Sequence, residues 1–254
     1  MLFDTHAHYY DRAFDADRAE VLDDMRNHNV GLILCPGCDL WSSEESIRLA
    51  EEYPFLYAAV GIHPEDANGL PADWLSRIEE LSRHPKVKAI GEIGLDYYWK
   101  EVPKDLQKEV FRAQLALAER LDLPVIVHDR EAHQDSLAIV KEFPNVRGVF
   151  HCYSGSAEDA KTLVKWGWHL SFTGTITFKN ARKAPEVIAA VPMERIMVET
   201  DSPYMAPTPY RGKRCDSRYV YRMAETIAQI KGLSTEEVER MTTENGKRLF
   251  GIEG

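Results

Sequence analysis

Short apolar runs recur at fairly even intervals along this chain of 254 residues, and polar segments with a helical rhythm separate them. The runs are rich in Val, Ile, Leu and Phe without polar alternation, which is typical of strands buried on both faces of a parallel sheet. A strand followed by a helix, eight times over, predicts a closed α/β barrel of the (β/α)8 type. The runs are Leu2-Phe3, Val30–Leu34, Leu56–Val60, Val87–Ile90, Val125–Val127, Val149-Phe150, Leu170–Phe172 and Ile196–Val198.

The segments between the runs show helical periodicity. From Asp105 to Leu121, apolar residues fall on one face at spacings of three and four, and charged residues occupy the other positions. Ser234, with Glu237 three positions later, predicts a capping box at the start of a helix near the C-terminus.

An open, doubly wound sheet is the structural alternative. Such a sheet usually carries a Gly-rich phosphate turn after its first strand, whereas this chain has Asp4-Thr5-His6-Ala7-His8 there. Barrels of this kind use about 250 residues as one unit. Because no linker or break in the pattern is present, we expect residues 1–254 to form one domain.

The sequence favours a cytoplasmic protein. No segment approaches the roughly 18 uninterrupted apolar residues of a membrane helix, and Asp4 and His6 stand where a secretory signal would be basic and then apolar. The four cysteines are too scattered to crosslink a domain of this size, so we expect reduced thiols. Cys35-Pro36-Gly37-Cys38 has redox-dithiol spacing, but ordinary residues at a strand end are the favoured interpretation.

The chain carries 31 basic and 41 acidic side chains, a net charge of −10. This balance opposes a broad nucleic-acid surface, because duplex binding uses many Lys and Arg contacts to phosphates. A nucleic-acid substrate would be held locally, at its end, in a metal-bearing pocket. No obligate protein partner is evident.

Ionisable side chains follow the apolar runs at their carboxyl ends. In a parallel barrel these ends share one face, where barrel enzymes carry their chemistry. Four other histidines, His28, His84, His133 and His169, serve as an internal control because they lie elsewhere relative to the runs. The residues expected to meet at the mouth are His6, His8, His63, Glu92, His128, His151 and Asp201.

The spacing of His6 and His8 points both imidazoles to the same side of a strand. With four further donors at equivalent strand ends, a metal site is the favoured interpretation over salt-bridged carboxylates or hydrogen-bonded core histidines. Six donors indicate two divalent cations, and Glu92, with its two oxygens, is the natural bridge between them. Mixed histidine and carboxylate ligands admit Zn²⁺, Mn²⁺ or Mg²⁺. The expected ligands are His6, His8, Glu92, His128, His151 and Asp201.

Several ordered motifs resemble the successive signatures of the TatD family of deoxyribonucleases, nearly from end to end of the chain. They are Asp4-Thr5-His6-Ala7-His8, Gly61-Ile62-His63-Pro64, Gly91-Glu92-Ile93-Gly94-Leu95-Asp96, Val127-His128, His151-Cys152-Tyr153-Ser154-Gly155, Glu199-Thr200-Asp201-Ser202-Pro203-Tyr204 and Pro207-Thr208-Pro209-Tyr210-Arg211-Gly212-Lys213. The resemblance implies a metal-dependent hydrolase barrel with two divalent ions that hydrolyses DNA, often from the 3′ end of single strands.

By matching positions, the resemblance implies that Glu92 is shared by two ions. His6, His8 and Asp201 would complete one site, and His128 and His151 the other. His63 would contact phosphate or support the ligands. Two positions depart from the family pattern, Cys215 and the Cys35–Cys38 segment, and neither is an expected ligand.

For catalysis, Asp201 is the candidate for orienting the attacking water or taking its proton. Arg211 and Lys213 are candidate phosphate contacts, with a solvated surface pair as the equally weighted alternative. Tyr97, Tyr98 and Trp99 could stack on a terminal base, or simply pack within their loop.

Two other functions remain open at this point. The first is a hydrolase of the same superfamily that acts on another ester, a lactone or an amide. Many such enzymes bridge their metals with a modified lysine, whereas this chain has Glu92. The second is a non-catalytic barrel with structural metals, but such sites are usually closed and rich in cysteine.

Overall fold

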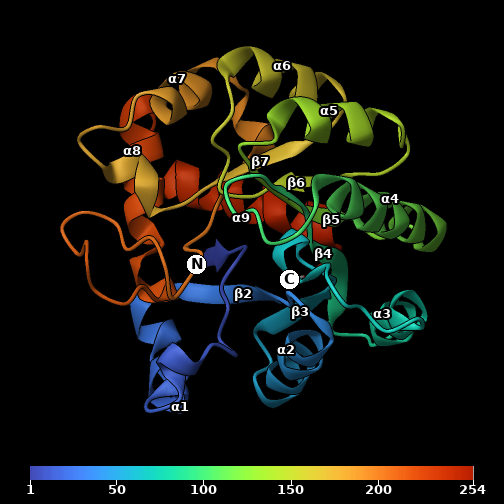
Figure 1. Cartoon of the computed structure of the whole chain (residues 1–254). Helices are drawn as coiled ribbons and strands as arrows, with labels where there is room; N and C mark the ends of the chain where they lie inside the picture. The colour runs from blue at the N-terminus through green and yellow to red at the C-terminus, as the bar shows by residue number, and fades with distance from the viewer. Residues whose placement is uncertain (254) are drawn as a thin grey trace.

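In the computed structural model, which describes residues 1–253, eight strands form one sheet in chain order and every neighbouring pair is parallel (Figure 1). Backbone hydrogen bonds from Thr5 to Val198 and from His8 to Ser202 link the last strand to the first. The predicted α/β barrel is therefore confirmed. The strands are β1 (Leu2–Asp4), β2 (Val30–Pro36), β3 (Leu56–Val60), β4 (Val87–Asp96), β5 (Val125–Arg130), β6 (Gly148–Phe150), β7 (His169–Phe172) and β8 (Ile196–Val198).

Helices surround the barrel on its outside (Figure 1). The α-helices are α1 (Arg18–Asp23), α2 (Leu40–Glu52), α3 (Trp74–Ser82), α4 (Lys104–Leu121), α5 (His133–Lys141), α6 (Ala157–Lys165), α7 (Lys183–Ala190), α8 (Tyr221–Lys231) and α9 (Thr235–Phe250). Short 3₁₀ helices lie in the connections: η1 (Arg12–Phe14), η2 (Met25–His28), η3 (Pro64–Asp66), η4 (Gly174–Thr177), η5 (Met193–Arg195) and η6 (Ser217–Tyr219).

Two strands extend far enough beyond their apolar runs to include expected metal donors. Glu92 and His128 were expected just after strands, but Glu92 lies inside β4 and His128 inside β5. The register of β4 against β5 is irregular between Ile90 and Ile93. Both strands thus project polar side chains at the mouth while they are still paired, a property that a search for apolar runs does not detect.

The helix boundaries follow from local capping. Ser234 accepts a hydrogen bond from the backbone N–H of Glu237, whose carboxylate accepts one from the Ser234 N–H, so the predicted capping box of α9 is confirmed. Asp39 and Ser42 form an equivalent box at the start of α2. The predicted helix from Asp105 to Leu121 is α4, which begins one residue earlier.

A separate apolar cluster fills the barrel interior. It takes one residue each from β1 to β6 and from β8, and it continues into the end of the chain, where Leu249, Phe250 and Ile252 are buried against it. The ring of Phe250 meets that of Phe3 edge to face, with centroids 6.1 Å apart. In Figure 1, α9 passes behind the strands. The barrel is therefore closed at its amino-terminal end.

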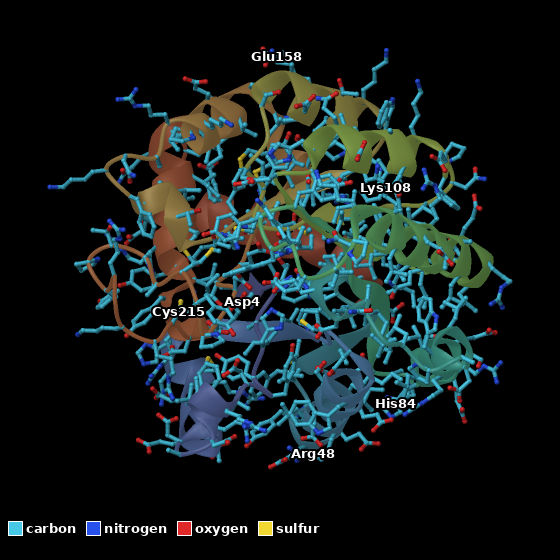
Figure 2. All side chains as sticks on the ribbon, viewed as in Figure 1. Asp4, Arg48, His84, Lys108, Glu158 and Cys215 are labelled. Atoms are coloured by element: carbon cyan, nitrogen blue, oxygen red, sulfur yellow. The ribbon has the colours of Figure 1, made fainter. Side chains whose placement is uncertain are left out.

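Polar side chains such as Arg48, His84 and Glu158 lie toward the outside of the molecule in Figure 2, whereas Asp4 lies near the centre. The four cysteines form no disulfide. Across residues 1–253, no helix combines the length and apolarity that crossing a lipid bilayer requires. The assignment of residues 1–254 to a single domain stays a prediction.

Candidate metal centre

The predicted donors meet at the carboxyl-terminal mouth of the barrel. His6 and His8 follow β1, His63 follows β3, His151 follows β6 and Asp201 follows β8. The backbone fixes the first of these segments on both sides, because Ala7 N–H donates to the carbonyl of Leu34 and Asp201 N–H donates to that of His6. Residues separated by almost the whole chain thereby lie together.

One group of donors surrounds the Oε2 oxygen of Glu92. Nε2 of His6 lies 3.1 Å from this oxygen and Nε2 of His8 lies 3.6 Å from it. The two imidazole nitrogens are 3.1 Å apart. Asp201 Oδ1 completes the group, 3.8 Å from His6 and 3.4 Å from His8.

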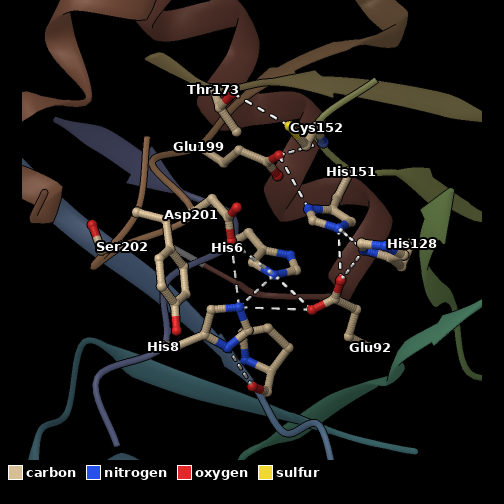
Figure 3. Close-up of polar contacts among 12 residues, drawn as sticks. His6, His8, Glu92, His128, His151, Cys152, Thr173, Glu199, Asp201 and Ser202 are labelled. Carbon is tan, nitrogen blue, oxygen red and sulfur yellow. Dashed lines mark hydrogen bonds and ion pairs between the residues drawn. The ribbon is translucent and has the colours of Figure 1, made fainter. Parts of the chain in front are cut away.

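A second group surrounds the other oxygen of Glu92. Nε2 of His151 lies 2.7 Å from Oε1, Nδ1 of His128 lies 2.9 Å from it and Nε2 of His63 lies 3.6 Å from it. Figure 3 shows Glu92 with His6 and His8 on one side and His128 and His151 on the other. The single carboxylate thus faces two separate sets of imidazoles with its two oxygens.

Sequence reasoning did not single out three residues that touch these donors. Asp96 Oδ2 lies 2.9 Å from Nε2 of His128. Tyr10 Oη lies 2.9 Å from Nδ1 of His8 and donates to the thiol sulfur of Cys38. Glu199 Oε1 accepts from the backbone N–H of Cys152 and lies 3.5 Å from Nδ1 of His151 (Figure 3). The acidic residues at the end of β4 and just after β8 were a usable signal for Asp96 and Glu199.

Electrostatics keep the carboxylates ionised. Burial disfavours the charged form of Glu92, but the imidazoles of His151, His6 and His63 outweigh burial and hold its pKa well below the usual value. Burial likewise opposes ionisation of Asp201, yet contacts with His8 and His6 lower its pKa. Both side chains therefore offer anionic oxygens to the centre.

The imidazoles divide into two classes. Burial lowers the pKa of His6, and burial together with His128 lowers the pKa of His63 to about 3. For His151 the neighbouring Glu92 and Glu199 outweigh burial and raise the pKa well above the usual value. The carboxylates of this cluster therefore favour positively charged partners, either protons on the imidazoles or a cation.

The donor chemistry fits a bound cation. His6, His8 and Glu92 offer three donor atoms within 4.8 Å of one another, and so do His63, Glu92 and His128. Buried imidazoles and carboxylates are paired or coordinate metals in folded proteins. A cation would replace the protons as the source of positive charge.

All of these donors except His6, which is fully buried, line a cavity of about 1140 Å³ at the mouth. Trp99, Arg130, Phe178, Arg182 and Lys183 also line it.

Arg211 is exposed, and its guanidinium packs 4.1 Å from the centre of the Phe178 ring instead of lining the cavity. Tyr97 donates to Asp135. Cys215 is fully buried and does not line the cavity. Of the control histidines, His169 begins β7 at the opposite end of the strand, and His133 contacts Asp129.

A family model described as TatD related DNase matches residues 3–251. The chain belongs to the TatD family. The expected resemblance is confirmed over nearly the whole chain, and with it the membership in a family of metal-dependent hydrolases.

Individual TatD proteins resemble this chain along their full length. A Bacillus subtilis protein named uncharacterized metal-dependent hydrolase YabD is 47% identical over 254 residues, covering 99% of this chain and 100% of its own. A Klebsiella pneumoniae protein named 3'-5' ssDNA/RNA exonuclease TatD is 31% identical, covering 99% and 98%. The crystal structure of YjjV, a TatD homologue from Escherichia coli, superposes with a TM-score of 0.93 at 30% identity, covering 99% and 98%.

Proposed function

We propose that this protein is a divalent-metal-dependent phosphodiesterase that removes nucleotides from single-stranded DNA. The observation that carries the proposal is the position of Glu92, whose two oxygens face two different sets of imidazole nitrogens. A carboxylate in this position would be shared by two cations. His6, His8 and Asp201 would complete one site, and His128 and His151 would complete the other.

The donor set suits Zn²⁺ or Mn²⁺, and Mg²⁺ less well because of the histidines. When bound, such cations supply Lewis acidity, which offsets negative charge on the phosphodiester and activates water. The protein contributes the fixed arrangement of donors in a cavity that keeps room for substrate.

The chain's own residues then direct hydrolysis. A water oxygen attacks phosphorus, the bond from phosphorus to the leaving sugar oxygen breaks, and that oxygen takes a proton. In the proposal, Asp201 orients the water and accepts its proton, since its carboxylate lines the cavity beside His8. His63 lies on the cavity side of Glu92 and contacts a phosphate oxygen.

The identity of the substrate is supported by the relatives. The Klebsiella protein is named for 3'-5' exonuclease activity on single-stranded DNA and RNA. The net charge of −10 makes broad binding of a duplex unfavourable, so an end held in one cavity suits this chain. The role of Arg211 as a phosphate contact stays a prediction; its guanidinium packs on the ring of Phe178, which lines the cavity.

Two rival functions lead to different results in the same assay. A superfamily hydrolase of another ester, a lactone or an amide would turn over those compounds and leave DNA intact. A barrel with structural metals would turn over neither.

The test is a gel assay with 5′-labelled single-stranded DNA, matched RNA and duplex, each with Zn²⁺, Mn²⁺ or Mg²⁺ and with excess EDTA. Stepwise shortening of the single strand, abolished by EDTA, is the expected result. Undiminished cleavage in EDTA would contradict the mechanism, and turnover of a lactone or aryl ester without nuclease activity would favour the first rival.

A further inference from the structure

Beyond the metal centre, a pair of exposed aromatic side chains stands at the rim of the same cavity. Tyr98 and Trp99 are 47% and 45% exposed, and Trp99 lines the cavity. An exposed apolar surface bordered by polar residues is typical of a ligand-binding site. A flat ligand that covers the indole would remove this apolar surface from water.

The aromatic pair is fixed relative to the metal centre by one carboxylate. Asp96 Oδ1 accepts hydrogen bonds from the backbone N–H groups of Tyr98, at 2.9 Å, and of Trp99, at 3.1 Å. The other oxygen of Asp96 contacts His128. The rings of Tyr98 and Trp99 meet edge to face, and the guanidinium of Arg130 covers Tyr98 at 3.9 Å. The same guanidinium lies farther from the Trp99 ring, at 6.0 Å, and Trp99 rather than Tyr98 lines the cavity, so Trp99 is the ring more accessible to a ligand.

Another part of the rim supplies positive charge. The segment from η4 to the start of α7 places Arg182 and Lys183 in the cavity lining. Because β4 and β7 are three positions apart in the eight-stranded order, the loops that follow them lie nearly across the mouth from each other. Within residues 1–253, neither Arg182 nor Lys183 forms an ion pair with a carboxylate. Because the lining also contains Glu65, Asp66 and Asp129, the positive charge is local to this part of the rim, where it favours an anionic ligand.

We propose that these two parts of the cavity rim bind a single nucleic-acid strand, with a base stacked on Trp99 and backbone phosphates on Arg182 and Lys183. This inference rests on the proposed function and adds a base-binding site to it. Aromatic stacking is tolerant of sequence and needs an unpaired base. The cavity of about 1140 Å³ exceeds the roughly 300–1,000 Å³ of a small-molecule pocket, leaving room beyond the cleaved phosphate.

The test measures binding of Mn²⁺-loaded full-length protein to an eight-nucleotide strand whose phosphorothioate linkages slow hydrolysis. An abasic residue is placed at each of the first four positions from the 3′ end in turn. For the wild type, an abasic residue at one of these four positions should weaken strand binding about 10-fold relative to the intact strand. Trp99→Ala should weaken binding of the intact strand by a similar factor and should no longer distinguish intact from abasic strands. Trp99→Phe should restore both the affinity and the distinction.

Matched controls separate stacking from damage to the fold. Trp166 at the end of α6 is also exposed and lies outside the cavity lining, so Trp166→Ala should leave binding unchanged. The double variant Arg182→Gln/Lys183→Gln should reduce the slope of log affinity against log salt by about 1.4, because each neutralised phosphate of a single strand accounts for about 0.7 of that slope. The same change at Lys161 and Lys165 on α6 should leave the slope unaltered.

Failure of this inference differs from failure of the proposed function. If the wild type digests unmodified DNA but Trp99→Ala discriminates intact from abasic strands as the wild type does, the stacking site is wrong and the nuclease stands. If no metal supports digestion yet Trp99 governs strand binding, the nuclease is wrong and the binding site stands.

Discussion

The carboxylate of Asp96 lies 2.9 Å from Nε2 of His128, and Nδ1 of the same ring lies 2.9 Å from Glu92. Asp96 therefore fixes both the tautomer and the orientation of an imidazole at the centre. Its other oxygen holds the turn at Tyr98 and Trp99, so one side chain connects the donor set to the rim.

Replacing Asp96 with Asn should weaken metal binding about 10- to 100-fold, because the imidazole of His128 would no longer face an anionic partner that sets its orientation and basicity. Metal affinity would be measured by competition with a chromogenic chelator. Asp122→Asn, at an exposed position on the surface, is the matched control. Equal affinity in Asp96→Asn and the control would exclude a positioning role.

Glu92→Ala should remove bound metal and nuclease activity together while far-ultraviolet circular dichroism stays native. The reason is that both sets of imidazoles face this single carboxylate. Elemental analysis after dialysis measures the metal content. Glu158→Ala on the outer surface controls for loss of a carboxylate elsewhere (Figure 2). Full metal occupancy in Glu92→Ala would contradict the bridging role.

Gly246→Ala should destabilise the protein by up to about 2 kcal/mol. A Cβ at this position in α9 would lie 2.7 Å from Cδ1 of the buried Phe3 ring, and overpacking typically costs about 1–3 kcal/mol. Alanine gains only about 1 kcal/mol in helix propensity. Urea unfolding measures the difference, with Glu244→Ala at an exposed position of the same helix as control. A more stable Gly246→Ala would show that the helix shifts to admit the methyl group.

His169 should make stability depend on pH. Burial, with the nearby cations of Arg195 and Arg248, lowers its pKa to about 4 from 6.5, and neither ring nitrogen has a hydrogen-bond partner. The folded state therefore keeps His169 neutral, while the unfolded state takes up a proton between pH 6.5 and 4. The contribution of neutral His169 to the free energy of unfolding is complete above pH 6.5. As the pH falls from 6.5 to 4, the free energy of unfolding decreases by up to about 3 kcal/mol for this reason.

The measurement for His169 is the free energy of unfolding at pH 7, 6, 5 and 4. His169→Phe should flatten this dependence relative to the wild type, whereas His28→Gln, at an exposed histidine, should not. Parallel curves for the wild type and His169→Phe would mean that the buried imidazole does not distinguish the two states.

The barrel was predictable because its signal is repeated. Each short apolar run has to be buried on both faces, and eight of them in series leave few other arrangements. The positions of His6, His151 and Asp201 then followed, since the carboxyl ends of parallel strands share one face. The strand pattern therefore indicated the candidate centre before any distance was known.

The ends of β4 and β5 were not predictable in the same way. Gly91 and Glu92 interrupt the apolar run of β4, although the strand continues to Asp96. Hydrogen bonds to the neighbouring strand, which no local pattern reports, hold this polar part in extended form. The contact between Asp96 and His128 depends on that continuation, and for this reason Asp96 was not singled out.

The closure of the barrel by α9 and the residues after it has a consequence for turnover. Within the described residues 1–253, Leu249, Phe250 and Ile252 pack into the interior cluster and cover the end of the barrel away from the metal centre. For an exonuclease, each freed nucleotide must leave by the opening through which the remaining strand entered. The departing nucleotide and the advancing strand therefore use the same opening of the cavity. This favours release of the strand between successive cuts.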